Sequence, residues 1–143
     1  ELRNIGRPVV LVFFGDHQPS AATTLNDELY PQEDTADHAF RIYQSTYFVW
    51  ANYEIAGNTE LNVYDTVGAN EIAAITLNKI GAPLADYQKA LLATRSDVPT
   101  INVAGYLGAD GLRYDLESED SPYASTIDKL QRMQYLEFAS KVQ

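Results

Sequence analysis

The stretch VVLVFFGDHQPS, residues 9–20, decides how the N-terminal part of this chain folds. Six apolar residues run without interruption from Val9 to Phe14, and a glycine, an aspartate and a histidine follow them directly. The β-branched and aromatic content predicts a strand over residues 8–14 that ends at Gly15. A continuous apolar run suits a strand covered on both faces, so we expect it in a parallel or mixed sheet.

The polar pair that follows this strand, Asp16 and His17, is the candidate site of the sequence. Ligands of open α/β sheets bind beyond the carboxyl ends of strands. A carboxylate oxygen and an imidazole nitrogen are suitable ligands for Mn²⁺, Zn²⁺ or iron, and a cation would compensate the carboxylate charge beside an apolar strand. The pair is also typical of hydrogen-bonded loop residues or of a capping aspartate. A catalytic metal site usually takes three or more protein ligands, and no further ligands stand in an obvious pattern.

The rest of the chain alternates between helical and extended patterns. Apolar spacing and punctuation by Pro and Gly predict helices over 23–30, 36–44, 68–80, 82–95 and 125–138, and strands over 45–52, 99–103 and 111–116. Turns are expected over 54–62 and 108–111, with Gly81 as a helix C-cap and Ser125 or Thr126 as an N-cap. This order of elements predicts an α/β or α+β fold.

Composition excludes several classes of function. The chain has 143 residues, enough for one domain with a core, and 45% of them are hydrophobic. Its formal net charge of −10 argues against nonspecific nucleic-acid binding and against docking on an anionic membrane surface. With no cysteine there is no disulfide, thiolate metal site or cysteine nucleophile.

The other candidate residues favour structural roles. His38 lies in a polar, acidic segment, and we expect it to be exposed on the surface. Ser20 has no nearby base and no nucleophile-elbow context, which argues against a serine hydrolase. Trp50 and the tyrosines are more typical of core or rim packing than of a sugar-binding platform.

Several segments, taken in order, resemble one family. The motif PVVLVFFGDHQPS is followed by the aromatic strand STYFVWANY, in which Tyr47 stands where the family usually has proline. The helical segment NKIGAPLADYQKALL and the closing GLRYDL and MQYLEF follow in the same order. Together they resemble the lipoteichoic acid synthase and phosphoglycerol transferase family, which belongs to the sulfatase branch of the alkaline phosphatase superfamily.

The resemblance implies a fold and a set of site residues. The chain would be the C-terminal part of a sulfatase-like α/β catalytic domain, with strands of the main sheet, a small antiparallel β layer and a C-terminal helix. Residues 1–98 would form the core α/β part and residues 99–143 the hairpin and helix. Asp16 and His17 would be two ligands of a divalent metal, commonly Mn²⁺, with Mg²⁺ or Zn²⁺ as alternatives. Ser20 would line the substrate pocket.

The resemblance also implies an activity for the parent protein. Members of the family lie outside the bacterial cell, tethered by N-terminal transmembrane helices, and transfer glycerol phosphate from a phosphatidylglycerol lipid onto a polymer or glycan. The family's threonine nucleophile, and the glutamate that helps hold it on the metal, precede the Gly-Asp-His motif by a long stretch. Only seven residues precede Pro8 here. We therefore expect the isolated chain to be inactive, to lack the N-terminal half of the catalytic domain and to be prone to self-association.

Two other functions stay open from the sequence. One is hydrolysis by the same kind of site, as in a sulfatase or phosphodiesterase, because sulfatase-like folds host both reactions. The other is a non-catalytic extracellular binding module whose acidic surface and tyrosines contact wall glycans or a protein partner.

Overall fold

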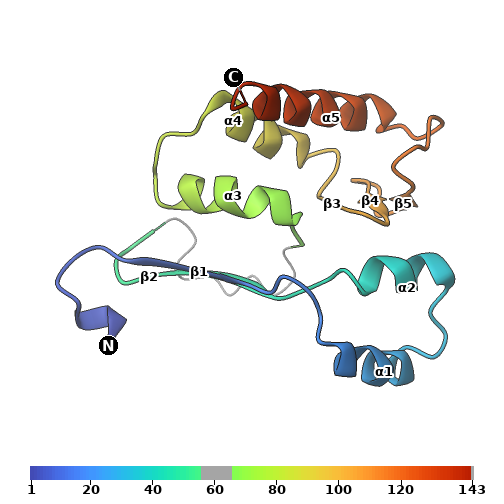
Figure 1. The fold of residues 1–143 in the computed structure, drawn as a ribbon, viewed down its shortest axis with the longest axis horizontal. Coiled ribbons are helices and arrows are strands. Elements are labelled where there is room, and N and C mark those ends of the chain that lie inside the picture. Colours follow the sequence, from blue (N-terminus) through green and yellow to red (C-terminus); the bar gives the residue numbers. More distant parts are fainter. Residues whose placement is uncertain (56–65, 143) are drawn as a thin grey trace. The chain divides into compact units, whose positions relative to one another are not determined.

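The computed structural model of this protein describes residues 1–55 and 66–142. The chain divides into two compact units, unit 1 over Glu1–Thr59 and unit 2 over Glu60–Gln143 (Figure 1). Within the described ranges the fold is mixed α/β, with five α-helices and two small antiparallel sheets. The boundary that the sequence suggests near residue 98 falls inside unit 2, in the connection between two of its elements.

Unit 1 is built on an antiparallel two-stranded ribbon. Its two strands pair in register from Val10 opposite Ala51 to Phe14 opposite Tyr47. Two short helices occupy the connection between the strands, as the sequence predicts. The elements in chain order are the 3₁₀-helix η1 (Leu2–Asn4), β1 (Val10–Phe14), α1 (Ser20–Leu29), α2 (Thr35–Arg41) and β2 (Tyr47–Ala51).

The strand β1 is present where the sequence predicts it, but its surroundings differ from the prediction. It pairs antiparallel with β2, and among the described residues it has no parallel neighbour. Leu11, Phe13 and Phe14 are 39%, 50% and 57% exposed, so the strand is not covered on both faces. The apolar run correctly indicated a strand. It did not indicate how much protein covers that strand, which depends on tertiary packing.

Asn52 fixes the start of the ribbon. Its side-chain Oδ1 accepts a hydrogen bond from the Val9 amide at 2.8 Å, while its Nδ2 donates to the carbonyl oxygens of Arg7 at 2.9 Å and Leu2 at 3.2 Å. One side chain therefore holds the N-terminal segment beside the strand pair, and so sets where β1 begins.

Unit 2 packs three helices and a three-stranded sheet around two clusters of buried residues. Its elements are η2 (Ala69–Glu71), α3 (Ile72–Lys79), α4 (Asp86–Thr94), β3 (Thr100–Asn102), β4 (Gly105–Leu107), β5 (Arg113–Tyr114) and α5 (Ala124–Ala139). Ala74, Leu91 and Leu130 join α3, α4 and α5 in one cluster. Tyr106 and Ile127 lie with Val98 in the other, which joins β4 to α5.

The small sheet of unit 2 has one more strand than the sequence predicts. β4 lies between β3 and β5, so the turn over 108–111 joins β4 to β5 and not β3 to β5. The strands β3 and β4 are joined by a tight turn in which the Asn102 side chain accepts a hydrogen bond from the Ala104 amide at 2.8 Å. Gly105 closes that turn at φ +139°, with the Tyr114 carbonyl where a Cβ would lie, so no other residue fits.

The helix ends confirm one predicted cap and correct another. Gly81 has φ +71° after α3, where its amide donates to Asn78 and the next amide, Ala82, donates to Leu77, as in a Schellman motif. The predicted N-cap of α5 at Ser125 or Thr126 is wrong, because the helix begins at Ala124. The Thr126 hydroxyl instead donates to the Asp97 carboxylate at 2.9 Å, a partner too distant in sequence to be predicted.

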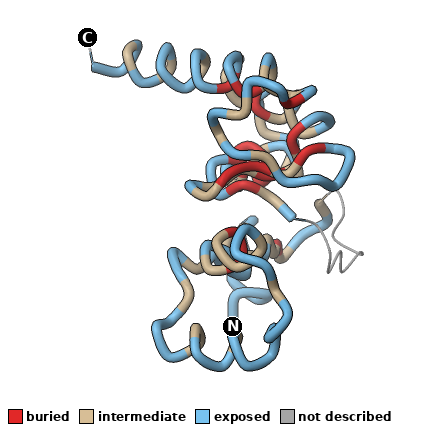
Figure 2. The backbone as a smooth tube through the Cα atoms, turned by 90° about the vertical axis from the view of Figure 1, so that its right-hand side faces the viewer, coloured by how far each residue is buried: buried red, intermediate tan, exposed pale blue. Residues whose placement is uncertain are grey.

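The apolar side of α5 is only half covered. Ile127 and Leu130 are buried, whereas Leu136 and Phe138 are 65% and 69% exposed, so the C-terminal turns are largely exposed (Figure 2). Of the described helices, none combines the length and apolar character needed to cross a bilayer. The predicted turn over 54–62 lies mostly outside the described residues.

Candidate functional site

The candidate site begins where β1 ends. The Gly15 amide donates to the Thr46 carbonyl at 3.1 Å, which carries the strand pairing one residue beyond β1. Gly15 is not in the left-handed region, but a Cβ on it would clash with the side-chain hydroxyl of Ser45, in the segment that leads into β2. The glycine thus allows close approach of the two segments, and the next two residues leave the ribbon in a bend.

Asp16 and His17 lie side by side, as the sequence predicts for adjacent ligands at a strand end. The Asp16 Oδ1 accepts a hydrogen bond from the His17 amide at 3.0 Å, and its Oδ2 lies 3.6 Å from the His17 Nε2. Two ligands of one metal at about 2.0–2.2 Å and a tetrahedral angle are separated by roughly 3.4 Å. The observed separation is therefore compatible with a shared cation.

The state of the imidazole follows from its other contact. The His17 Nδ1 lies 2.9 Å from the backbone carbonyl oxygen of Gln18. A carbonyl oxygen can only accept, so Nδ1 carries the proton in this bond. In the neutral ring the Nε2 then has the free electron pair and faces the Asp16 carboxylate. A cation or a proton between these two electron-rich atoms would be favourable, and these residues fit either one.

Asp16 and His17 are not buried, so burial gives no reason for a cation at this site. The side chains of His17 and Asp16 are 76% and 84% exposed, so water already solvates the carboxylate. The carboxylate therefore does not need a cation to compensate its charge beside the apolar strand. Only their mutual geometry argues for a ligand, and an exposed pair binds a cation weakly because water competes for it.

No third ligand joins the pair within residues 1–55 and 66–142, where no group of three or more His, Asp or Glu side chains could hold a metal. Ser20 follows closely as the first residue of α1 and is exposed. The second histidine, His38, lies on α2 in a different cluster.

That second cluster surrounds Arg41, which is 9% exposed. Its Nε and Nη2 donate to the Glu33 carboxylate, with Nη2 2.7 Å from Oε2, and Nη2 also donates to Asp27 at 3.0 Å. These bonds raise the pKa of Arg41, first through Glu33 and then through Asp27. His38 accepts from the guanidinium at 3.2 Å and its side chain is 42% exposed, so it is half-buried in this cluster where the sequence predicts surface exposure.

This charge network holds α1, the following loop and α2 together. The Arg41 guanidinium also lies over the Tyr30 ring, 5.2 Å from its centroid. Because the Arg41 guanidinium donates to both carboxylates, it offsets one of their two negative charges and gives the cluster a structural role. Local sequence patterns did not indicate it, since Asp27 and Glu33 lie 14 and 8 residues before Arg41, outside α2.

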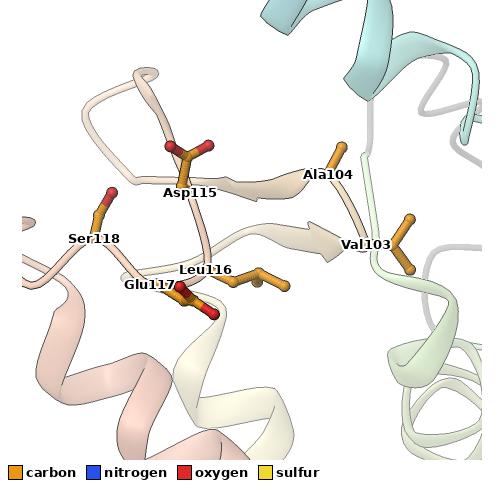
Figure 3. Close-up of a pocket in the computed structure, with 6 residues that line it drawn as sticks. All are labelled: Val103, Ala104, Asp115, Leu116, Glu117 and Ser118. Carbon is orange, nitrogen blue, oxygen red and sulfur yellow. The ribbon is translucent and has the colours of Figure 1, made fainter.

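Unit 2 contains a surface hollow of about 450 Å³. It is lined by the β3–β4 turn and the segment that follows β5, namely Val103, Ala104, Asp115, Leu116, Glu117 and Ser118. Figure 3 shows the carboxylates of Asp115 and Glu117 pointing in different directions, so they do not converge on one point. The hollow contains none of the predicted site residues.

Beside the β4–β5 turn, Asp110 organises a group of tyrosines. Its carboxylate accepts from the Leu112 amide at 3.0 Å and from the Tyr114 hydroxyl at 2.7 Å. These bonds, the backbone bond first, lower the pKa of Asp110, and the bond to Asp110 raises the pKa of Tyr114 to about 12. Tyr114 stacks on Tyr106 and meets Tyr123 edge-on, at centroid distances of 5.5 and 5.8 Å. The group packs the sheet against the start of α5.

Comparison with known proteins adds no relative to this description. A scan against protein-family models, a search of curated proteins and a search of solved structures each found no match.

Proposed function

We propose that this chain is the C-terminal part of the catalytic domain of an extracellular, metal-dependent phosphoglycerol transferase of the sulfatase type, in which Asp16 and His17 hold a divalent cation. The observation that supports this most is the paired geometry at the end of β1, where a free imidazole nitrogen faces a carboxylate oxygen at 3.6 Å. The motif order along the whole sequence supports the transferase class.

The two residues would hold the cation through Asp16 Oδ2 and His17 Nε2. A bound divalent cation supplies charge neutralisation for a phosphoryl group and acidifies a hydroxyl. In the proposed reaction an attacking threonine hydroxyl, on a part of the parent outside this sequence, replaces the diacylglycerol oxygen on phosphorus and passes its proton to that leaving oxygen. The acceptor hydroxyl then replaces the threonine oxygen on phosphorus and passes its own proton to that threonine oxygen.

Two corollaries concern the chain as it stands. Because the proposed threonine nucleophile lies outside this sequence, we expect the 143-residue chain to turn over neither a phosphatidylglycerol-type lipid nor a chromogenic phosphodiester. With two ligands it binds Mn²⁺ weakly, because a complete site takes three or more. Measured turnover by the purified chain would overturn the assignment of the missing nucleophile.

The test of the site is a titration of the isotope-labelled chain with Mn²⁺, followed by paramagnetic broadening of its amide signals in NMR spectra. We expect broadening to start at residues 15–18 and to be lost in Asp16→Asn and His17→Gln. Asp86→Asn is the matched carboxylate control, since Asp86 is fully exposed on α4. His38→Gln is the histidine control. Broadening that starts elsewhere, or that survives both site substitutions, would overturn the proposal.

A further inference from the structure

Gln18 lies directly after the candidate pair and has its side-chain amide fully engaged. Its Nε2 donates to the backbone carbonyl oxygens of Arg41 at 2.8 Å and Gln44 at 2.9 Å. Its Oε1 accepts from the Asn26 side chain at 3.0 Å. Both donor hydrogens and one acceptor site are thus satisfied, on partners as far as 26 residues away.

These bonds attach the segment that follows β1 to the α-helices α1 and α2 of unit 1. Arg41 is the last residue of α2, and its carbonyl oxygen also accepts from the Gln44 amide at 2.9 Å, so the Gln18 side chain is a second donor to a carbonyl at the helix end. Asn26 lies on α1. The half-buried Gln18 is therefore fixed relative to α1, α2 and the connection between α2 and β2, unlike the exposed residues on either side of it.

The backbone of the same residue acts on the candidate site. The Gln18 carbonyl oxygen accepts the Nδ1 hydrogen of His17 at 2.9 Å. A hydrogen bond to one ring nitrogen sets which nitrogen carries the proton and which way the ring points. If residue 18 rotated, the His17 Nδ1 would lose the carbonyl oxygen to which it donates. The proton would then no longer be held on Nδ1, away from the Nε2 that faces Asp16.

We propose that Gln18 is a positioning residue for the Asp16–His17 site: its side chain anchors its own carbonyl, and that carbonyl selects the imidazole tautomer that can bind a metal. The inference rests on the proposed function for the metal, but its tautomer part stands on the hydrogen bonds alone. Partners outside the ligand shell of metal sites typically change metal affinity by about 10- to 100-fold when removed.

The competing explanation is that Gln18 only caps α2 and stabilises unit 1. The substitution Gln18→Met keeps the side-chain length and removes every polar contact. Gln88→Met is the matched control, because the Gln88 side chain also binds a backbone group, the Ala85 amide at 2.9 Å, and lies in unit 2. Asn26→Ala is a milder variant that removes only the bond to the Gln18 Oε1.

The first readout is the tautomer of His17, from the ¹⁵N chemical shifts of its ring nitrogens in the full chain at a pH where the ring is neutral. We expect wild type and Gln88→Met to carry the proton on Nδ1. Gln18→Met should become a mixture with the Nε2-protonated form, and Asn26→Ala should shift in the same direction by less. An unchanged tautomer in a folded Gln18→Met chain would overturn the inference.

The second readout is Mn²⁺ affinity by the same NMR titration, with a fall of about tenfold expected in Gln18→Met. If wild type binds no Mn²⁺, the proposed function fails while the tautomer result still decides the role of Gln18. If Gln18→Met does not fold, Asn26→Ala decides: no tautomer shift in that variant would also overturn the inference.

Discussion

Phe13 of β1 stacks on Phe48 of β2, directly opposite in the strand register, with ring centroids 5.2 Å apart and an interplanar angle of 14°. The two residues are still 50% and 45% exposed. Leu11, two residues before Phe13, points to the same face and is also exposed. This face of the ribbon, defined by Leu11, Phe13 and Phe48, is therefore an apolar surface on a very acidic chain.

An exposed apolar ribbon with two strand edges favours association between copies. We expect the chain to self-associate as its concentration rises, more strongly in high salt because screening weakens the repulsion from its net charge of −10. The double substitution Phe13→Ser with Phe48→Ser should reduce the association in sedimentation velocity measurements. Leu112→Ser, at a residue of unit 2 that is 60% exposed, is the control and should leave association unchanged. Equal association in both variants would contradict the assignment to the ribbon.

The proposed transferase function predicts the effect of a substitution at Asp16 in the parent protein. We expect Asp16→Asn to lower the rate of glycerol phosphate transfer on the order of a hundredfold or more, because charge stabilisation by a metal contributes several kcal/mol to such reactions. The metal content of the purified parent should fall together with the rate. The control is Asp86→Asn, which should leave both unchanged. A fully active Asp16→Asn parent would contradict the proposed role of Asp16 as a metal ligand.

The core of unit 2 provides a stability prediction. Leu91 is 1% exposed and joins α4 to α3 and α5. We expect Leu91→Ala to lower the free energy of unfolding by about 2–5 kcal/mol, through lost burial and the cavity that remains. Leu112→Ala, which removes the same atoms from an exposed position, should change it by less than about 0.5 kcal/mol. Urea denaturation followed by circular dichroism measures both, and similar values would show that Leu91 is not a core residue.

The bond between Tyr114 and Asp110 predicts how the stability of unit 2 depends on pH. The folded pKa of Tyr114 is raised from 10.0 to about 12, so its contribution is complete below pH 10 and is lost as pH rises toward 12. The folded pKa of Asp110 is lowered, so its contribution is complete above its ordinary value of 3.8 and is lost as pH falls through the lowered value.

The variant Tyr114→Phe isolates that bond. We expect it to be less stable than wild type in urea denaturation near neutral pH, and the difference to shrink between pH 10 and 12, where wild type loses the bond. Tyr43→Phe, at an exposed tyrosine of unit 1, is the control. A constant difference across that pH range would show that the hydroxyl of Tyr114 does not contribute through Asp110.

Local pattern was enough to predict most elements of the fold. The β-branched and aromatic run gave β1, and Gly81 marked the end of α3 because a left-handed residue is needed there. The strand β4 was missed because Val103 and Ala104 form the turn before it, and neither is a typical hairpin-turn residue. The pairing of β1 and its exposure could not be predicted, since both depend on residues far away in sequence.

The candidate site also has one part that the sequence predicted and one part that it did not. Asp16 and His17 are neighbours in the chain, so sequence alone placed them together. The contacts of Gln18 with Arg41 and Gln44 cross 23 and 26 residues, and the ion pair between Glu71 and Arg95 crosses 24. No local period links such positions, so the residues that anchor the site and unit 2 become visible only in three dimensions.

The single tryptophan of the chain, Trp50, lies in β2 of unit 1, while the packed tyrosines Tyr106, Tyr114 and Tyr123 lie in unit 2. Indole emission therefore reports on the surroundings of Trp50 in the first unit, and the packed phenol rings contribute near-ultraviolet circular dichroism from the second. Melting curves recorded with both optical probes on one unmodified sample will show whether the two halves lose their structure together or in separate transitions.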